Sequence, residues 1–86
     1  MFAVELEFSG DPARLALRAE HRNKLAALRD AEKVRLAGPW ADESGALLVF
    51  DVADEAAVRE ILDDDPYYRA PGVTVRRIVD WKVVVG

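Results

Sequence analysis

The chain has 86 residues, of which 51% are apolar and 33% charged, with a net charge of −4 and no cysteine. This composition is typical of a small globular protein and not of a disordered segment, and we expect one domain spanning residues 1–86. The absence of cysteine excludes disulfides, thiolate catalysis and cysteine zinc sites. An acidic chain without a basic stripe disfavours nucleic-acid binding, which needs clustered Lys and Arg.

The first residues, Met1–Glu5, include neither a basic region nor the start of a long apolar run. We therefore expect no signal peptide, no membrane span and a cytoplasmic location. The chain has one histidine, and no carboxylates with metal-ligand spacing accompany it. Phosphate-binding loops and dinucleotide fingerprints are also absent, so the sequence predicts neither a metal nor an organic cofactor.

The first part of the chain predicts a strand followed by a helix. Large apolar residues alternate with smaller or acidic ones over residues 2–8, which is the period of two that a strand requires. Asp11 and Pro12 then offer a helix N-cap and a proline at the first helical position. The following residues are rich in Ala, Leu, Arg and Glu and predict a helix to Glu32, although the part before His21 could be a separate turn.

The rest of the chain predicts three more strands and a second helix. Residues 46–52 are apolar on both faces and should form a central strand, covered on each side. Asp54 can cap the second helix, which Pro66 ends because proline cannot continue it. The other two strands are expected over residues 34–37, stopped by Gly38-Pro39, and over residues 73–85.

The order of these elements is βαββαβ, the split βαβ pattern of ferredoxin-like α+β folds. Right-handed crossovers put both helices on one face of a four-stranded antiparallel sheet. The other face carries no helix, yet it has apolar positions, and a large open apolar surface is an aggregation liability or an interface. We expect a homodimer to bury this helix-free face, since two-fold interfaces are the commonest kind. The alternative is a monomer with a partly polar, solvated face.

His21 and Asp65 are the leading candidates for chemistry. His21 shares an apolar helix stripe with Leu17 and Leu25, so it is either a half-buried histidine with a satisfied hydrogen bond or a group that moves protons. Asp65 ends an acidic run at a helix C-terminus, where negative charge is unfavourable. The proline that follows forces Asp65 out of the helix, so its side chain can point back into the fold. A carboxylate that meets the imidazole would orient it for general acid–base catalysis.

Further residues could bind a small molecule beside this pair. Arg18 precedes the histidine by one helical turn and could position an anion, with solvation at the surface as the alternative. Tyr67 follows the Asp-Pro step and could wall a pocket with its hydroxyl free for a ligand, whereas core packing is the alternative for Tyr67 and Tyr68. Gly38 and Pro39 end a strand, where the missing side chain of glycine would let a ligand approach the backbone.

Four short motifs stand out along the chain: Arg18-Ala19-Glu20-His21, Ala37-Gly38-Pro39, Asp65-Pro66-Tyr67 and Val79-Asp80-Trp81. In their order and spacing the chain resembles the YCII-like family over nearly its whole length. The resemblance implies a dimeric α+β barrel in which two ferredoxin-like halves pack sheet to sheet. It also implies an active site built around a His–Asp pair, which His21 and Asp65 would form here.

Together, the residues and the resemblance predict a small cofactor-free enzyme that performs isomerisation or elimination on a small organic substrate. His21 would be the general base or acid, and Asp65 would orient its ring. The resemblance implies these reactions because the family includes a dehydrochlorinase of a chlorinated hydroxyquinol, and the barrel is shared with muconolactone isomerases and small monooxygenases. The alternatives are a non-catalytic module that binds a small ligand or regulates, and a cofactor-free monooxygenase on the same barrel.

Overall fold

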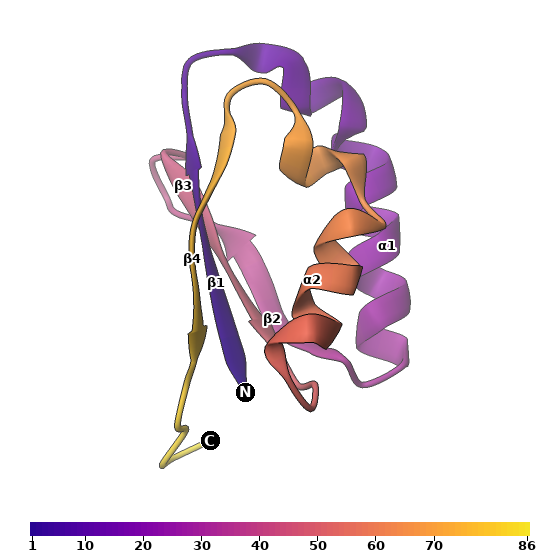
Figure 1. The fold of residues 1–86 in the computed structure, drawn as a ribbon. Coiled ribbons are helices and arrows are strands. Elements are labelled where there is room, and N and C mark those ends of the chain that lie inside the picture. The colour runs from indigo at the N-terminus through magenta and orange to yellow at the C-terminus, as the bar shows by residue number, and fades with distance from the viewer.

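The computed structural model describes all residues from Met1 to Gly86. Two α-helices cover one face of a four-stranded antiparallel sheet, as Figure 1 shows from the edge of the sheet. The strand order β2-β3-β1-β4 is that of the ferredoxin-like fold, which confirms the predicted α+β class. The elements are β1 (Phe2–Phe8), η1 (Pro12–Leu17, a 3-10 helix), α1 (Arg18–Asp30), β2 (Val34–Pro39), β3 (Gly45–Phe50), α2 (Glu55–Asp63), η2 (Pro66–Arg69, a 3-10 helix) and β4 (Val73–Asp80).

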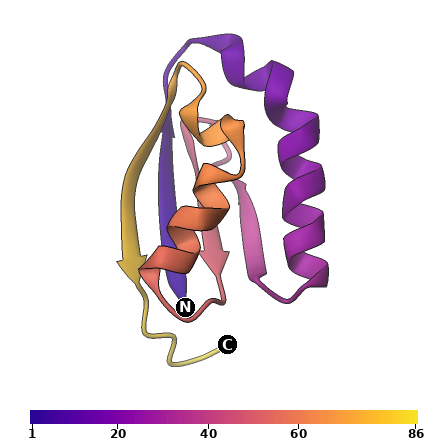
Figure 2. The ribbon, with the colours of Figure 1, turned by 45° about the vertical axis from the view of Figure 1, so that its right-hand side comes forward.

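The core lies between the sheet and the two helices. β1 is central and pairs with β3 and β4, so that Val4 stands opposite Leu48 on one side and Ile78 on the other. Alternate β1 residues point into the core, and Val4 is fully buried there. Helix α2 adds Val58 to the same core. Figure 2 shows α2 in front of β1 and β3, whereas α1 stands on the β2 side of the molecule.

The segment that begins at Asp11 is divided into two helical pieces, as the sequence allowed. The Asp11 carboxylate accepts a hydrogen bond from the Ala13 N–H at 2.9 Å and caps η1, and α1 follows from Arg18. Helix α1 ends at Asp30, two residues before the predicted end, because Glu32 adopts a left-handed conformation with φ 61°. The Lys33 N–H then bonds back to the Leu28 carbonyl at 2.8 Å, which closes the helix end.

The predicted last strand, residues 73–85, is too long, because β4 ends at Asp80. Asp80 pairs with Phe2, the first residue of β1, and β1 is the only neighbour of β4 in the sheet. The Trp81 N–H still donates to the Met1 carbonyl at 2.8 Å, but no later residue pairs with a strand. The tail is consequently exposed, and Val84 retains 82% of its accessible surface.

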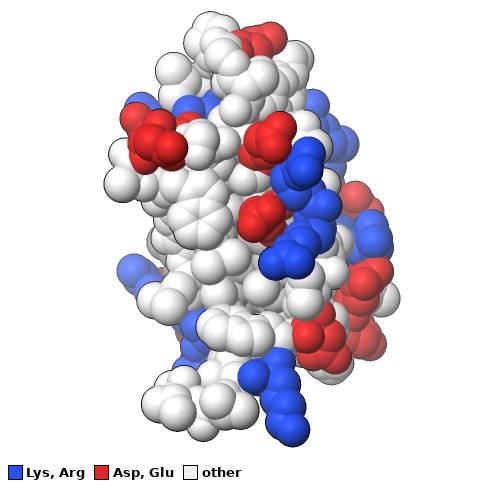
Figure 3. Space-filling model, turned by 90° about the vertical axis from the view of Figure 1, so that its left-hand side faces the viewer, with Lys and Arg blue, Asp and Glu red and all other residues white.

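The face of the sheet opposite the helices is open. Figure 3 shows uncharged surface on this face, interrupted by acidic and basic side chains. Val49 of β3 points to this side and is nevertheless 4% exposed, while Leu36, Trp40 and Trp81 are 73%, 40% and 46% exposed. Trp40 lies across Gly45, where any side chain would collide with the backbone of β1.

Candidate active site

His21 and Asp65 come together in the space between α1 and the start of η2. His21 lies in the first turn of α1 and Asp65 directly before η2, and their side chains are 9% and 6% exposed. The Nδ1 atom of His21 is 2.7 Å from Oδ2 of Asp65. Because a carboxylate can only accept, Nδ1 carries the proton and donates it, so Nε2 keeps its lone pair in the neutral ring.

The position of Asp65 follows from the proline after it. Its backbone is extended, with φ −123° and ψ 110°, so the chain leaves the α2 direction as the sequence predicted. The second carboxylate oxygen, Oδ1, accepts a hydrogen bond from the Tyr67 N–H at 3.0 Å and caps η2. One oxygen therefore fixes the carboxylate to its own backbone while the other holds the histidine.

Tyr67 fixes the plane of the imidazole. Its ring stacks on the His21 ring with the centroids 3.9 Å apart and the planes 6° from parallel. Its hydroxyl accepts a long hydrogen bond of 3.4 Å from Arg14, whose guanidinium lies 4.0 Å from the centroid of the Phe8 ring. With Asp65 at one edge and Tyr67 on one face, the His21 ring has little freedom to rotate.

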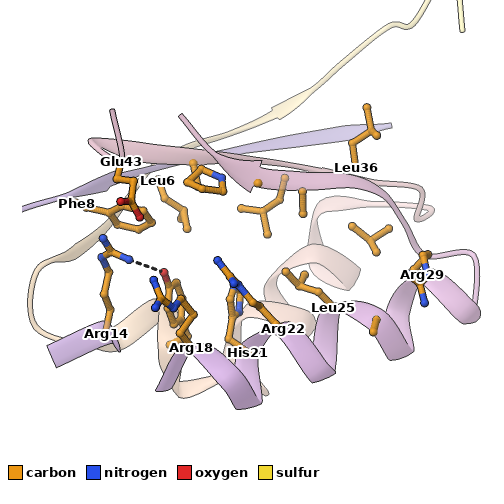
Figure 4. Close-up of a pocket in the computed structure, with 18 of the residues that line it drawn as sticks. Leu6, Phe8, Arg14, Arg18, His21, Arg22, Leu25, Arg29, Leu36 and Glu43 are labelled. Carbon is orange, nitrogen blue, oxygen red and sulfur yellow. Dashed lines mark hydrogen bonds between the residues drawn. The ribbon is translucent and has the colours of Figure 1, made fainter. Parts of the chain in front are cut away.

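A cavity of about 490 Å³ opens beside the histidine, between the η1–α1 segment and strands β1, β2 and β3. Its size is within the range of pockets that bind small molecules. Figure 4 shows the side chains that line it, with apolar residues of the sheet facing the arginines of the helical segment. Of the residues singled out in the sequence, those that line it are His21, Arg18, Gly38, Pro39 and Tyr67.

Asp65 is the one predicted site residue that does not line this cavity. Asp65 stands behind the histidine and lines a second cavity, of about 650 Å³, between the two α-helices. A β-carbon added to Gly38 would meet no atom within 4 Å, so open space lies in front of this glycine. Arg14 and Arg22 also line the cavity and were not predicted, although their spacing of four residues on either side of Arg18 is visible in the sequence.

Tyr68 packs against the other side of the histidine. Its ring meets that of His21 edge to face at 87°, with 5.2 Å between centroids. The Tyr68 hydroxyl is buried and has no hydrogen-bond partner. Burial, followed by the nearby charge of Asp65, raises the pKa of Tyr68 far above its ordinary value, so this side chain stays neutral.

No cluster of three or more His, Asp or Glu side chains is arranged to hold a metal ion. None of the helices has the length and apolar character needed to cross a membrane.

Fold and site together define a small ferredoxin-like protein with a buried histidine–aspartate pair beside an open cavity. The chain belongs to the YCII family: the family described as "YCII-related domain" matches residues 2–82. This match confirms the resemblance seen in the motifs. No curated protein matches the chain by sequence.

Among solved structures, the chain is similar to 5-chloro-2-hydroxyhydroquinone dehydrochlorinase (TftG) from Burkholderia phenoliruptrix AC1100, in complex with 2,5-dihydroxybenzoquinone. The TM-score is 0.60 and the identity 16%, over 95% of this chain and 94% of the other. At that identity the likeness establishes a shared fold.

Proposed function

We propose that this protein is a small cofactor-free enzyme in which His21 transfers a proton and Asp65 orients it. The observation that carries the proposal is the 2.7 Å contact between two buried side chains at the wall of a cavity. With Nδ1 held by the carboxylate, Nε2 is the nitrogen available to a bound substrate, and the carboxylate stabilises the imidazolium that forms. A positioned acid–base group of this kind contributes about 10²–10⁴-fold to a rate.

The reaction that fits is isomerisation or elimination on a small, activated cyclic substrate. In an elimination His21 accepts a proton from the substrate, a chloride leaves with its bonding electrons, and a new double bond remains. The net loss of H⁺ and Cl⁻ requires no oxidant or reductant. The similar structure is named for the removal of HCl from a chlorinated trihydroxybenzene, which makes that class of compound the first substrate to examine.

We further propose that the other residues of the cavity wall hold the substrate. The Tyr67 hydroxyl and the Arg18 guanidinium are polar groups close to the histidine, and both line the same cavity. Gly38 and Pro39 present an edge of β2 on the opposite side. The open space in front of Gly38 would let a substrate ring approach the backbone.

We also propose that two chains pair through the helix-free sheet face into a dimeric α+β barrel. This face leaves Leu36, Trp40 and Trp81 at least 40% exposed, and beyond Trp81 the tail that follows β4 exposes Val84 and Val85 almost completely. Apolar surface of this kind on a small protein marks an interaction site. A two-fold pairing would cover the face on both chains at once.

Chloride release from 5-chloro-2-hydroxyhydroquinone tests the enzymatic proposal. His21→Gln should lower the rate by about 10²–10⁴-fold. Asp65→Asn should lower it as well, and imidazole ¹⁵N shifts should reveal loss of the single Nδ1–H tautomer. Asp64→Asn is the matched control, because the Asp64 side chain is exposed and its carboxylate pairs only with Lys24, at 3.3 Å.

A second assay covers a substrate that lacks a leaving group. Exchange of solvent deuterium into the ring of 1,2,4-trihydroxybenzene reports the same proton transfer, again with and without His21. If the wild-type protein catalyses neither process, or if His21→Gln retains full activity, the enzymatic proposal is wrong. Ligand binding without turnover would then favour the non-catalytic module.

A further inference from the structure

Three arginines follow one another at intervals of four residues along the segment that carries the histidine. Arg14 lies on η1, and Arg18 and Arg22 lie on α1. All three line the 490 Å³ cavity, and Figure 4 shows their side chains extending from the helical segment toward the strands. Like charges at this spacing destabilise a helix, so the alignment is unfavourable within the chain itself.

Arg18 and Arg22 have no partner in the protein. The ion pairs of the structure involve other cations, and neither of these two guanidiniums hydrogen-bonds to a protein group. Arg29 and Arg35 line the same cavity, but each is paired with an aspartate, at 3.3 and 2.8 Å respectively. The chain has more carboxylates than cations, with a net charge of −4, yet Arg18 and Arg22 are not paired with any of them.

The remaining charges of the cavity lie toward its other end. Arg14 is held by the Phe8 ring and the Tyr67 hydroxyl. Glu43 is the one carboxylate among the lining residues. It precedes Ser44, whose carbonyl accepts a hydrogen bond from the Phe8 N–H at 2.8 Å, so it lies at the Phe8 end of the cavity with Arg14. The charge of Glu43 thus offsets Arg14 first and leaves Arg18 and Arg22 uncompensated.

We propose that Arg18 and Arg22 bind an anionic group of the ligand, and that this cavity takes small cyclic or aromatic anions such as carboxylates. Two guanidiniums one helical turn apart can hold the two oxygens of a single carboxylate. The ring of such a ligand would lie against apolar side chains such as Leu25 and Leu48 of the same cavity. That this ligand is also the substrate of His21 rests on the function proposed above, whereas anion binding itself does not.

Benzoate and benzamide test this proposal, because they share a ring and a planar head group and differ in charge. Calorimetric titration at low ionic strength should show benzoate binding and benzamide binding at least about tenfold more weakly. Arg18→Gln and Arg22→Gln should each weaken benzoate binding by about tenfold or more, and added salt should weaken it in the wild type. The matched control is Arg59→Gln, which removes the same charge from α2, outside the cavity.

Three results would overturn the proposal: no benzoate binding by the wild type, equal affinity for benzamide, or an Arg59→Gln loss as large as those at Arg18 and Arg22. Benzoate binding by the wild type is measured without turnover, so this test is separate from the test of catalysis. If the anion site is real, the wild type binds benzoate more tightly than benzamide, whether or not the protein turns over any substrate. Benzoate binding with no wild-type turnover would refute the enzyme and leave the anion site in place.

Discussion

The buried hydroxyl of Tyr68 leads to a counterintuitive prediction: Tyr68→Phe should stabilise the protein. The hydroxyl lies beside the His21–Asp65 pair and has no hydrogen-bond partner, so folding removes it from water without compensation. Such a loss costs about 1–3 kcal/mol. Phenylalanine keeps the ring and its edge contact with the histidine, so we expect a gain of about 1 kcal/mol at pH 8, or about 4–8 °C in Tm for a domain of this size.

The gain should increase in alkaline solution. Folding raises the pKa of Tyr68, so above the ordinary tyrosine value of about 10 the unfolded chain loses this proton while the folded chain retains it. Ionisation of the unfolded state then favours unfolding, and wild-type stability falls by about 1.4 kcal/mol per pH unit from this group alone. The Phe variant lacks that contribution. The difference between the two proteins should therefore widen from pH 10 to pH 11.

Urea unfolding, followed by tryptophan fluorescence at one fixed protein concentration, measures both effects. Tyr67→Phe is the matched control, because the Tyr67 hydroxyl accepts a hydrogen bond from Arg14 and its removal should not stabilise the fold. If Tyr68→Phe instead destabilises the protein by about 1 kcal/mol, which is the net contribution of a typical hydrogen bond, or by more, the hydroxyl is bonded and the reasoning fails. A difference that stays constant with pH would refute the linkage argument.

Two further predictions concern the interface and the buried pair. Leu36→Lys should convert a dimer to a monomer in sedimentation velocity, because Leu36 is 73% exposed on the helix-free face. The control Leu15→Lys, at a site 46% exposed on η1, should leave the dimer intact. A monomeric wild type would refute the dimer. His21→Leu should destabilise the fold by about 3 kcal/mol or more by leaving the Asp65 charge buried and unpaired, and adding Asp65→Asn should restore part of that loss in urea unfolding. A double variant less stable than His21→Leu alone would contradict this account.

The sequence could predict the fold because local signals agreed with one another. Each of these signals depends on only a few neighbouring residues: the alternation of apolar residues over β1, the helix cap at Asp11, and the helix end set by the proline after Asp65. The end of β4 is different, since it depends on where β1 begins. Asp80 pairs with Phe2, the first residue of β1, and residues 81–85 contain no signal that their neighbouring strand has ended. The apolar character of that tail favours a strand, but pairing partners decide whether one forms.

The same distinction explains what could be predicted of the site. The pre-proline position of Asp65 predicts that its side chain leaves the helix, but the 2.7 Å contact joins residues 44 positions apart and depends on how α1 packs. Arg22 was overlooked because an arginine on an exposed helix face looks like ordinary solvation. Only the structure shows that Arg18 and Arg22 border the cavity and have no carboxylate partner.

The energetics of the buried pair favour the proposed catalytic role over a purely stabilising one. Removing a carboxylate from water costs several kcal/mol, and apolar residues of similar volume often pack as well as a buried polar pair or better. Asp65 could cap η2 through Oδ1 alone, without any contact to a histidine. The additional bond from Oδ2 to His21 leaves Nε2 as the ring nitrogen available to a ligand, at the wall of a cavity with two unpaired arginines. A rigid base next to cationic groups suits proton removal from an anionic substrate, since the cations also stabilise the negative charge that develops.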